Sequence, residues 1–303
     1  MVVYEVSLNC YTRFLMTNDK FTIPLAKPKY ITVQGQARSG KGSLVRTITA
    51  KFDREFRVLT IDQGMKFRVF AKLALDEGLD YENLGVLRDY VLTPQNQYKV
   101  LEELRVAADL SRPELEERYY AHKTSNIAGM FGKVSETHDV VVSLLLDEVR
   151  QARGVYDIVI VDGRAMYKYG KQLDNEGVVD YVLAVDVICE PLVAARRVTG
   201  IFAPVEELSQ EELIKLIYTT QDISRRNSSD ARRRRDPSVY LHEAFEFDVL
   251  HVPEDLDTFE KMCQKVAEIG VLSLDNSFTQ SVEQFTEPSA RLIYEVVKKS
   301  ITK

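Results

Sequence analysis

Residues 30–52 read YITVQGQARSGKGSLVRTITAKF, in which an apolar run leads through a glycine-rich loop into a helical pattern. Gly35, Gly40 and Lys41 have the G-x-x-x-x-G-K spacing of a phosphate-binding loop. Glycines let consecutive backbone N–H groups curl around an anion, the start of the helix adds its positive end, and the lysine reaches the transferred phosphoryl group. We therefore expect this stretch to bind a nucleoside triphosphate rather than to form a simple turn.

The hydroxyl that normally follows the lysine of such a loop is displaced by one position. Gly42 intervenes, and Ser43 supplies the hydroxyl. We expect ATP to be held by Gly35, Gly40, Lys41, Gly42 and Ser43. ATPases, GTPases and small-molecule kinases share this kind of loop, so the loop by itself leaves the acceptor open.

Short segments rich in valine and isoleucine recur along the chain and predict strands buried on both faces, as in a parallel sheet. They are YITVQ from Tyr30, RVLTID from Arg57, YDIVIVD from Tyr156, YVLAVDV from Tyr181 and FEFDVLHV from Phe245. Helical patterns lie between them, over residues 42–52, 95–151 and 211–226. This alternation predicts an α/β fold, with a central parallel five-stranded sheet flanked by helices as in P-loop kinases.

The same patterns divide the chain into three parts. We expect an N-terminal extension over residues 1–28, a kinase-like domain over 29–272 and a C-terminal extension over 273–303. The extensions would pack on the core or mediate self-association. Within the domain we expect a helical acceptor-binding insert at about 95–150 and a mobile lid at about 220–237.

Charge and composition exclude several classes of protein. The three cysteines, Cys10, Cys189 and Cys263, are far apart and suggest neither disulfides nor a zinc site. No apolar run approaches the roughly 20 residues of a membrane span, so we expect a cytoplasmic protein with no membrane partner. A net charge of -6 argues against nucleic acid as a partner, although Arg232 to Arg235 form a local basic run.

Four further segments resemble the bacterial cytidylate kinase family, one of the nucleoside monophosphate kinases whose loop reads G-K-G-S/T. The first is IDQGMKFR, the second the insert at residues 122–151, the third VIVDGR and the fourth the lid sequence RRNSSDARRRRDP. The matching positions are Asp62, Gly64 and Arg68, then Asp162, Gly163 and Arg164, then Arg226, Asp230, Arg233 and Pro237, with Asn227 where the family has aspartate. With the phosphate loop, the resemblance covers roughly residues 29 to 270.

The resemblance implies a role for most of these side chains. Arg68, Arg164 and Arg233 would hold the acceptor phosphate, and Arg226 and Asp230 would contact the sugar or the transferred group. The catalytic residues would be Lys41, Arg164, Arg226 and Arg233, and the acceptor-binding residues Asp62, Arg68, Arg164, Asp230 and Arg233. Two phosphate groups must approach each other, and arginines that neutralise both lower that barrier. An ionised acceptor phosphate is already a nucleophile, so no catalytic histidine is needed.

Magnesium is the expected metal cofactor beside ATP. Asp162 ends a strongly apolar strand and would orient Mg²⁺, directly or through water, together with the hydroxyl of Ser43. An aspartate in this place is equally consistent with a turn or a helix cap.

The resemblance fails at the positions that read cytosine. In a gap-free alignment these positions are Gly132, Val141 and Ala165, none of which has a polar side chain. Either other side chains read the base, with Asn126, Lys133, Ser135 and Glu136 near in sequence, or the alignment of the insert has slipped.

We expect the protein to transfer the γ-phosphoryl group of ATP to a nucleoside monophosphate, CMP or dCMP first. A P-loop kinase with another small acceptor and a non-catalytic nucleotide sensor are the alternatives. A nucleic-acid-associated protein that uses Arg225 to Arg235 is a third.

Overall fold

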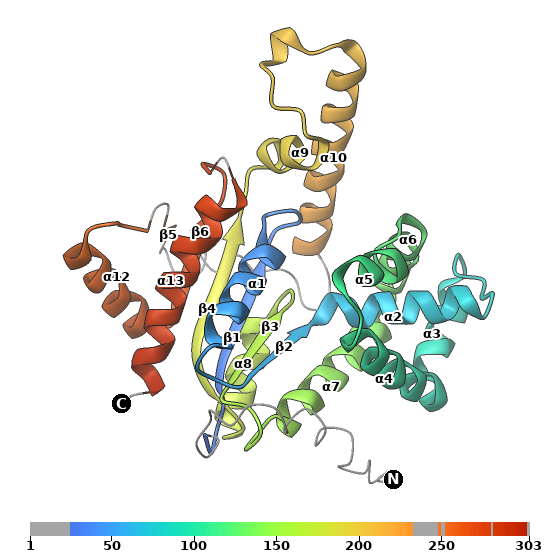
Figure 1. Cartoon of the computed structure of the whole chain (residues 1–303). Coiled ribbons are helices and arrows are strands. Elements are labelled where there is room, and N and C mark those ends of the chain that lie inside the picture. The colour runs from blue at the N-terminus through green and yellow to red at the C-terminus, as the bar shows by residue number, and fades with distance from the viewer. Residues whose placement is uncertain (1–24, 233–247, 250–251, 280, 302–303) are drawn as a thin grey trace.

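The computed structural model describes residues 25–232, 248–249, 252–279 and 281–301. In these residues six parallel strands form one sheet in the order β2-β3-β1-β4-β6-β5. The strands are β1 (Lys29–Gly35), β2 (Val58–Asp62), β3 (Ile158–Asp162), β4 (Asp180–Ile188), β5 (Asp248–Val249) and β6 (Val271–Asp275). Helices flank the sheet, and the predicted α/β fold class is confirmed (Figure 1).

Two details of the sheet differ from the expectation. Five strands have five residues or more, but the fifth of these is β6, which the sequence reasoning did not identify. The expected strand from Phe245 appears as the two-residue edge strand β5. β6 escaped notice because it has only five residues and interrupts its apolar run with Ser273, just before a polar stretch.

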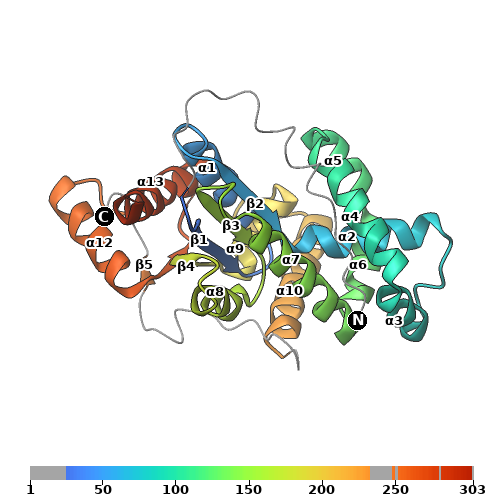
Figure 2. The ribbon, with the colours of Figure 1, turned by 90° about the horizontal axis from the view of Figure 1, so that it is seen from below.

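Helices cover both faces of the sheet (Figure 2). On one face α1 (Lys41–Phe52), α12 (Leu256–Ile269) and α13 (Val282–Ile301) form a continuous apolar core with the sheet. On the other face α7 (Ser135–Gln151) and α8 (Met166–Asn175) pack on β3 and its neighbours. The predicted boundary at residue 272 therefore falls inside β6, and the expected C-terminal extension contributes a strand and a core helix to the domain.

A second bundle lies beside the sheet and has its own apolar core. It contains α2 (Gln63–Asp76), α3 (Leu84–Leu92), α4 (Pro94–Ala108), α5 (Arg112–Tyr119), α6 (His122–Phe131) and the first part of α7. The residues expected at about 95–150 are thus largely helical, and they pack together with α2 and α3. Lys66 on α2 is buried and its ammonium lies 2.7 Å from a carboxylate oxygen of Glu148 on α7, which ties the bundle together.

The α9–α10 hairpin projects beyond the carboxyl edge of the sheet (Figure 1). It consists of α9 (Pro191–Thr199), a 3-10 turn (Val205–Glu207) and α10 (Gln210–Ala231). The last part of α10 covers residues 220–231 of the predicted lid, and the rest of the lid beyond residue 232 lies outside the described residues. Among the helices described, none is long and apolar enough to cross a membrane.

Candidate functional site

The phosphate loop joins β1 to α1 with the backbone geometry that its glycines permit. Gly35 has φ 151° and Gly40 has φ 92°, in the region that favours glycine. A Cβ on Gly35 would lie 2.2 Å from the backbone oxygen of Val187, and a Cβ on Gly40 would lie 2.6 Å from Nδ2 of Asn276. Both glycines are therefore required by their surroundings.

Two side chains from outside the loop hold it in place. Asn227 on α10 accepts a hydrogen bond of 2.9 Å from the backbone N–H of Ala37. Asn276, just after β6, donates one of 2.8 Å to the backbone oxygen of Ser39. Asn227 thus links α10 to the phosphate loop. Nothing in the local sequence around Asn276 signals its role, because the contact depends on β6.

Lys41 begins α1 and forms an ion pair with Asp162, which ends β3. Burial, together with the nearby Arg164, Arg68 and Arg226, lowers the pKa of Lys41 to about 8 against the opposing effect of Asp62. Predicted site residues from three separate segments are thus near enough to act electrostatically on the Lys41 ammonium group.

Two of the predicted acceptor-side residues form an ion pair across the site. Arg164 follows β3 and pairs with Asp230, which is buried on α10. The backbone N–H of Arg164 donates a hydrogen bond of 2.8 Å to Oε1 of Gln63, the residue that stands where the family has serine. The predicted partners Arg233 and Pro237 lie outside the described residues.

Asp62 ends β2 and caps α2, since its Oδ1 accepts hydrogen bonds from the N–H groups of Gly64 and Met65. Its Oδ2 accepts a hydrogen bond of 3.1 Å from the hydroxyl of Tyr120. The guanidinium of Arg68 lies 4.3 Å from the centre of the Tyr120 ring, which is a cation–π distance. Tyr120 therefore positions both predicted residues.

Sequence reasoning missed Tyr120, because it lies in the part of the insert that keeps few identities with the family. A second guanidinium, that of Arg112, lies 5.1 Å from the centre of the same ring. Among the described residues, Nε of Arg68 is buried without a hydrogen-bond partner. The site thus has a buried donor that an anionic ligand oxygen could satisfy.

The donor set expected for magnesium consists of oxygen atoms only. The hydroxyl of Ser43 lies in the first turn of α1 and accepts a hydrogen bond of 2.9 Å from Arg46. The carboxylate of Asp162 ends β3 beside Lys41. In the described part of the chain, no cluster of three or more His, Cys, Asp or Glu side chains could hold a metal. Two oxygen donors fit Mg²⁺ bound together with phosphate oxygens and water, which is its usual mode beside nucleotides.

The positions aligned with the family's base-reading residues have other roles. Val141 is fully buried in the core of the bundle. Gly132 ends α6, and its oxygen accepts a hydrogen bond of 3.0 Å from the ring nitrogen Nε2 of His138. Ala165, with φ 55°, precedes α8. Val141 in particular faces the interior, so on the gap-free alignment this position makes no contact with a ligand.

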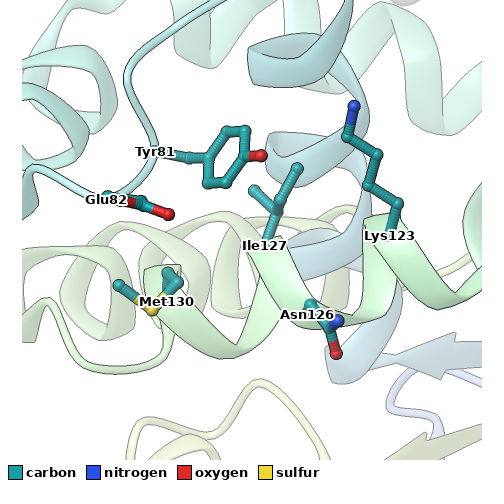
Figure 3. Close-up of a pocket in the computed structure, with 6 residues that line it drawn as sticks. All are labelled: Tyr81, Glu82, Lys123, Asn126, Ile127 and Met130. Carbon is teal, nitrogen blue, oxygen red and sulfur yellow. The ribbon is translucent and has the colours of Figure 1, made fainter.

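A pocket of about 380 Å³ lies in the insert between α6 and the segment that follows α2 (Figure 3). It is lined by Tyr81, Glu82, Lys123, Asn126, Ile127 and Met130. Of the four side chains considered as replacement base readers, Asn126 lines this pocket. Lys133 contacts the sulfur of Met130 at 3.3 Å, and the hydroxyl of Ser135 donates to the carboxylate of Glu136.

Comparisons with known proteins give little beyond this geometry. No protein-family model matches the chain, and no curated protein does. A structure of TT1252 from Thermus thermophilus shares 15% identity at a TM-score of 0.35, covering 91% of this chain and 100% of that one. A structure from the PezAT chromosomal toxin–antitoxin system of Streptococcus pneumoniae shares 14% identity at a TM-score of 0.29, covering 95% of this chain and 94% of that one. Scores this low carry no information about function.

Proposed function

We propose that the protein is a phosphotransferase that moves the γ-phosphoryl group of ATP to a nucleoside monophosphate, with CMP or dCMP as the first candidates. The observation that carries this proposal is the convergence on Lys41 of Arg68, Arg164, Arg226 and the two carboxylates Asp62 and Asp162. Several cations around one loop fit two phosphate-bearing substrates.

In this proposal the chain acts by positioning and by charge neutralisation. The loop N–H groups and Lys41 bind the β- and γ-phosphates, for which Lys41 leaves Asp162. Arg68 donates from its buried Nε to the acceptor phosphate. Arg164 likewise leaves Asp230 to bind the acceptor phosphate. Until the substrates bind, the ion pairs with Asp162 and Asp230 hold Lys41 and Arg164 in place. The acceptor phosphate attacks as an anion, so no side chain removes a proton.

Magnesium would be held by Ser43 and Asp162, and when bound it supplies positive charge that neutralises the phosphate oxygens. Asn227 links the loop to α10, so closure of the lid over the substrates would be transmitted directly to the phosphate loop. Closure excludes water and disfavours hydrolysis of ATP.

One observation favours a second candidate, a kinase of the same fold with another small phosphorylated acceptor. The position that would read cytosine is occupied by the buried Val141. A buried valine side chain offers no hydrogen bond to a base. Loss of a side chain that hydrogen-bonds the base usually costs about 1 to 3 kcal/mol of discrimination between bases.

A coupled assay of ADP release from Mg-ATP across CMP, dCMP, UMP, AMP and GMP tests the proposal, with Lys41→Ala as control. We expect release that depends on CMP or dCMP and that disappears in the variant. If none of the five nucleotides stimulates ADP release but another compound in an unbiased metabolite panel does, the second candidate would replace the proposal. Tight ATP binding without any turnover would instead indicate a nucleotide sensor.

A further inference from the structure

The helix α10 presents a partly apolar face to solvent on the side away from the phosphate loop. Its buried side carries Leu216 and Ile223, which pack on α9, and Asn227, which holds the loop. On the outer side the exposed fractions are 68% for Tyr218 and 45% for Ile214. Large exposed side chains grouped on one helix face are typical of an interaction surface.

The charges on this outer face are arranged symmetrically about Tyr218. Glu211 lies seven residues before Tyr218, and Arg225 lies seven residues after it. Seven residues are close to two helical turns, so all three side chains project from the same side of α10. Both Glu211 and Arg225 are exposed. The face thus has an acidic end at Glu211, a basic end at Arg225 and Tyr218 with Ile214 at its centre, and the exposed Lys215 and Asp222 lie along the edge of that centre.

We propose that two copies of this chain associate through the outer faces of α10, packed antiparallel about a two-fold axis at Tyr218. In that arrangement Glu211 of each copy faces Arg225 of the other, and the two Tyr218 rings meet at the axis. A two-fold interface must be self-complementary, and an acidic and a basic end at equal distances from Tyr218 satisfy this condition. The charge pattern selects a second copy of this chain over an unrelated partner.

The dimer would connect the two candidate sites. The opposite side of α10 carries Asn227 and Asp230, which contact the phosphate loop and Arg164. An interface that fixes the outer side of the helix therefore also restricts the movement of the lid in both copies. This inference does not depend on the identity of the acceptor.

Sedimentation velocity of the full chain over a wide concentration range is the first test, with 34.6 kDa as the mass of one copy. We expect a dimer whose dissociation constant rises with salt, because exposed charge pairs are screened. Arg225→Glu should weaken the dimer at least about tenfold by placing like charges together. Glu211→Arg combined with Arg225→Glu should restore it, which a general loss of stability would not do.

A cross-link locates the interface independently of these charges. Tyr218→Cys in a Cys10→Ser background places one thiol of each copy at the proposed axis, while Cys189 and Cys263 remain buried. We expect rapid oxidation to a disulfide-linked dimer, and no such product from Tyr98→Cys, which is exposed on α4. A monomer at every concentration, a dimer that the double charge exchange does not restore, or a dimer without the Tyr218→Cys cross-link would each overturn the proposal.

Discussion

The carboxyl edge of the sheet and the helical insert hold their candidate functional residues in different ways. At the sheet edge, β2 and β3 end in register with Asp62 opposite Asp162, and the neighbouring strand β1 continues from Val33, opposite Asp162, to Gly35 at the start of the loop. In the insert, side chains such as Tyr120 and Asn126 depend on how several short helices pack. The first region is determined by backbone geometry, and the second by side-chain packing. Substitutions at the sheet edge should therefore strongly weaken phosphate binding, whereas substitutions in the insert should change which acceptor binds.

Gly35→Ala and Gly129→Ala give the largest expected contrast between the two regions. The new Cβ at Gly35 would meet the Val187 oxygen at 2.2 Å, whereas a Cβ at Gly129, inside α6, meets nothing within 4 Å. We expect Gly35→Ala to cost about 3 kcal/mol of stability and to abolish ATP binding. Gly129→Ala should stabilise by about 0.5 kcal/mol, because alanine loses less backbone entropy in a helix. Chemical denaturation would measure the stability of both variants, and titration would measure their ATP affinity. Equal effects of Gly35→Ala and Gly129→Ala would contradict the proposed difference between the two regions.

Lys41→Ala tests the chemistry of the sheet edge without changing its backbone. We expect nucleotide-dependent ADP release to fall on the order of 10²–10³-fold, because a half-buried cation beside the transferred group is lost. The matched control is Lys123→Ala, which removes an exposed lysine from the pocket in the insert. That variant should change the Michaelis constant of the acceptor at most. Similar losses of turnover in both variants would contradict this division of roles.

The lowered pKa of Lys41 predicts opposite pH dependences for the stability of the chain and for its affinity for ATP. The pKa is about 8 in the folded chain and 10.5 ordinarily, so between these values the unfolded chain binds more protons than the folded one. The contribution of Lys41 to stability therefore rises with pH across this interval. ATP affinity should change in the opposite direction, falling by up to ~tenfold per pH unit above 8, because the triphosphate requires the protonated lysine. Calorimetric titrations of ATP should show this fall in the native chain, and its persistence in Lys41→Met would refute the assignment.

Tyr120→Phe should have the smallest effect, and it tests whether the tyrosine hydroxyl helps to position the acceptor side of the site. The ring that lies against Arg68 stays, and only the hydrogen bond to Asp62 is removed. A single such bond is worth about 1 kcal/mol, so we expect the Michaelis constant of the acceptor to rise about fivefold with turnover nearly unchanged. Tyr98→Phe, at an exposed tyrosine of α4, is the matched control. A fall in turnover alone would show that Tyr120 does not position the acceptor side.

The same contrast explains what the sequence could predict. Gly35, Gly40 and Lys41 form a local motif whose spacing implies its geometry. Asp162 was identified because it ends an apolar strand, and Asp62 because the segment IDQGMKFR resembles a family motif. β6 and Asn276 were not identified, because a five-residue strand followed by a polar stretch has no strong local pattern. Tyr120 could not be identified either, since its contact with Asp62 joins residues 58 positions apart. The base-reading side chains stay unassigned because they depend on packing within the insert.

In the proposed reaction the cluster around Lys41 binds the phosphates of two substrates together. Calorimetry with a bisubstrate compound, in which adenosine and cytidine are joined by five phosphates, tests it most directly against ATP alone. We expect binding at least ~100-fold tighter than that of ATP, because the two halves share one binding event. Arg68→Ala should remove about tenfold of that gain and leave ATP binding unchanged. An affinity no greater than that of ATP would contradict the claim that an acceptor phosphate site exists beside the loop.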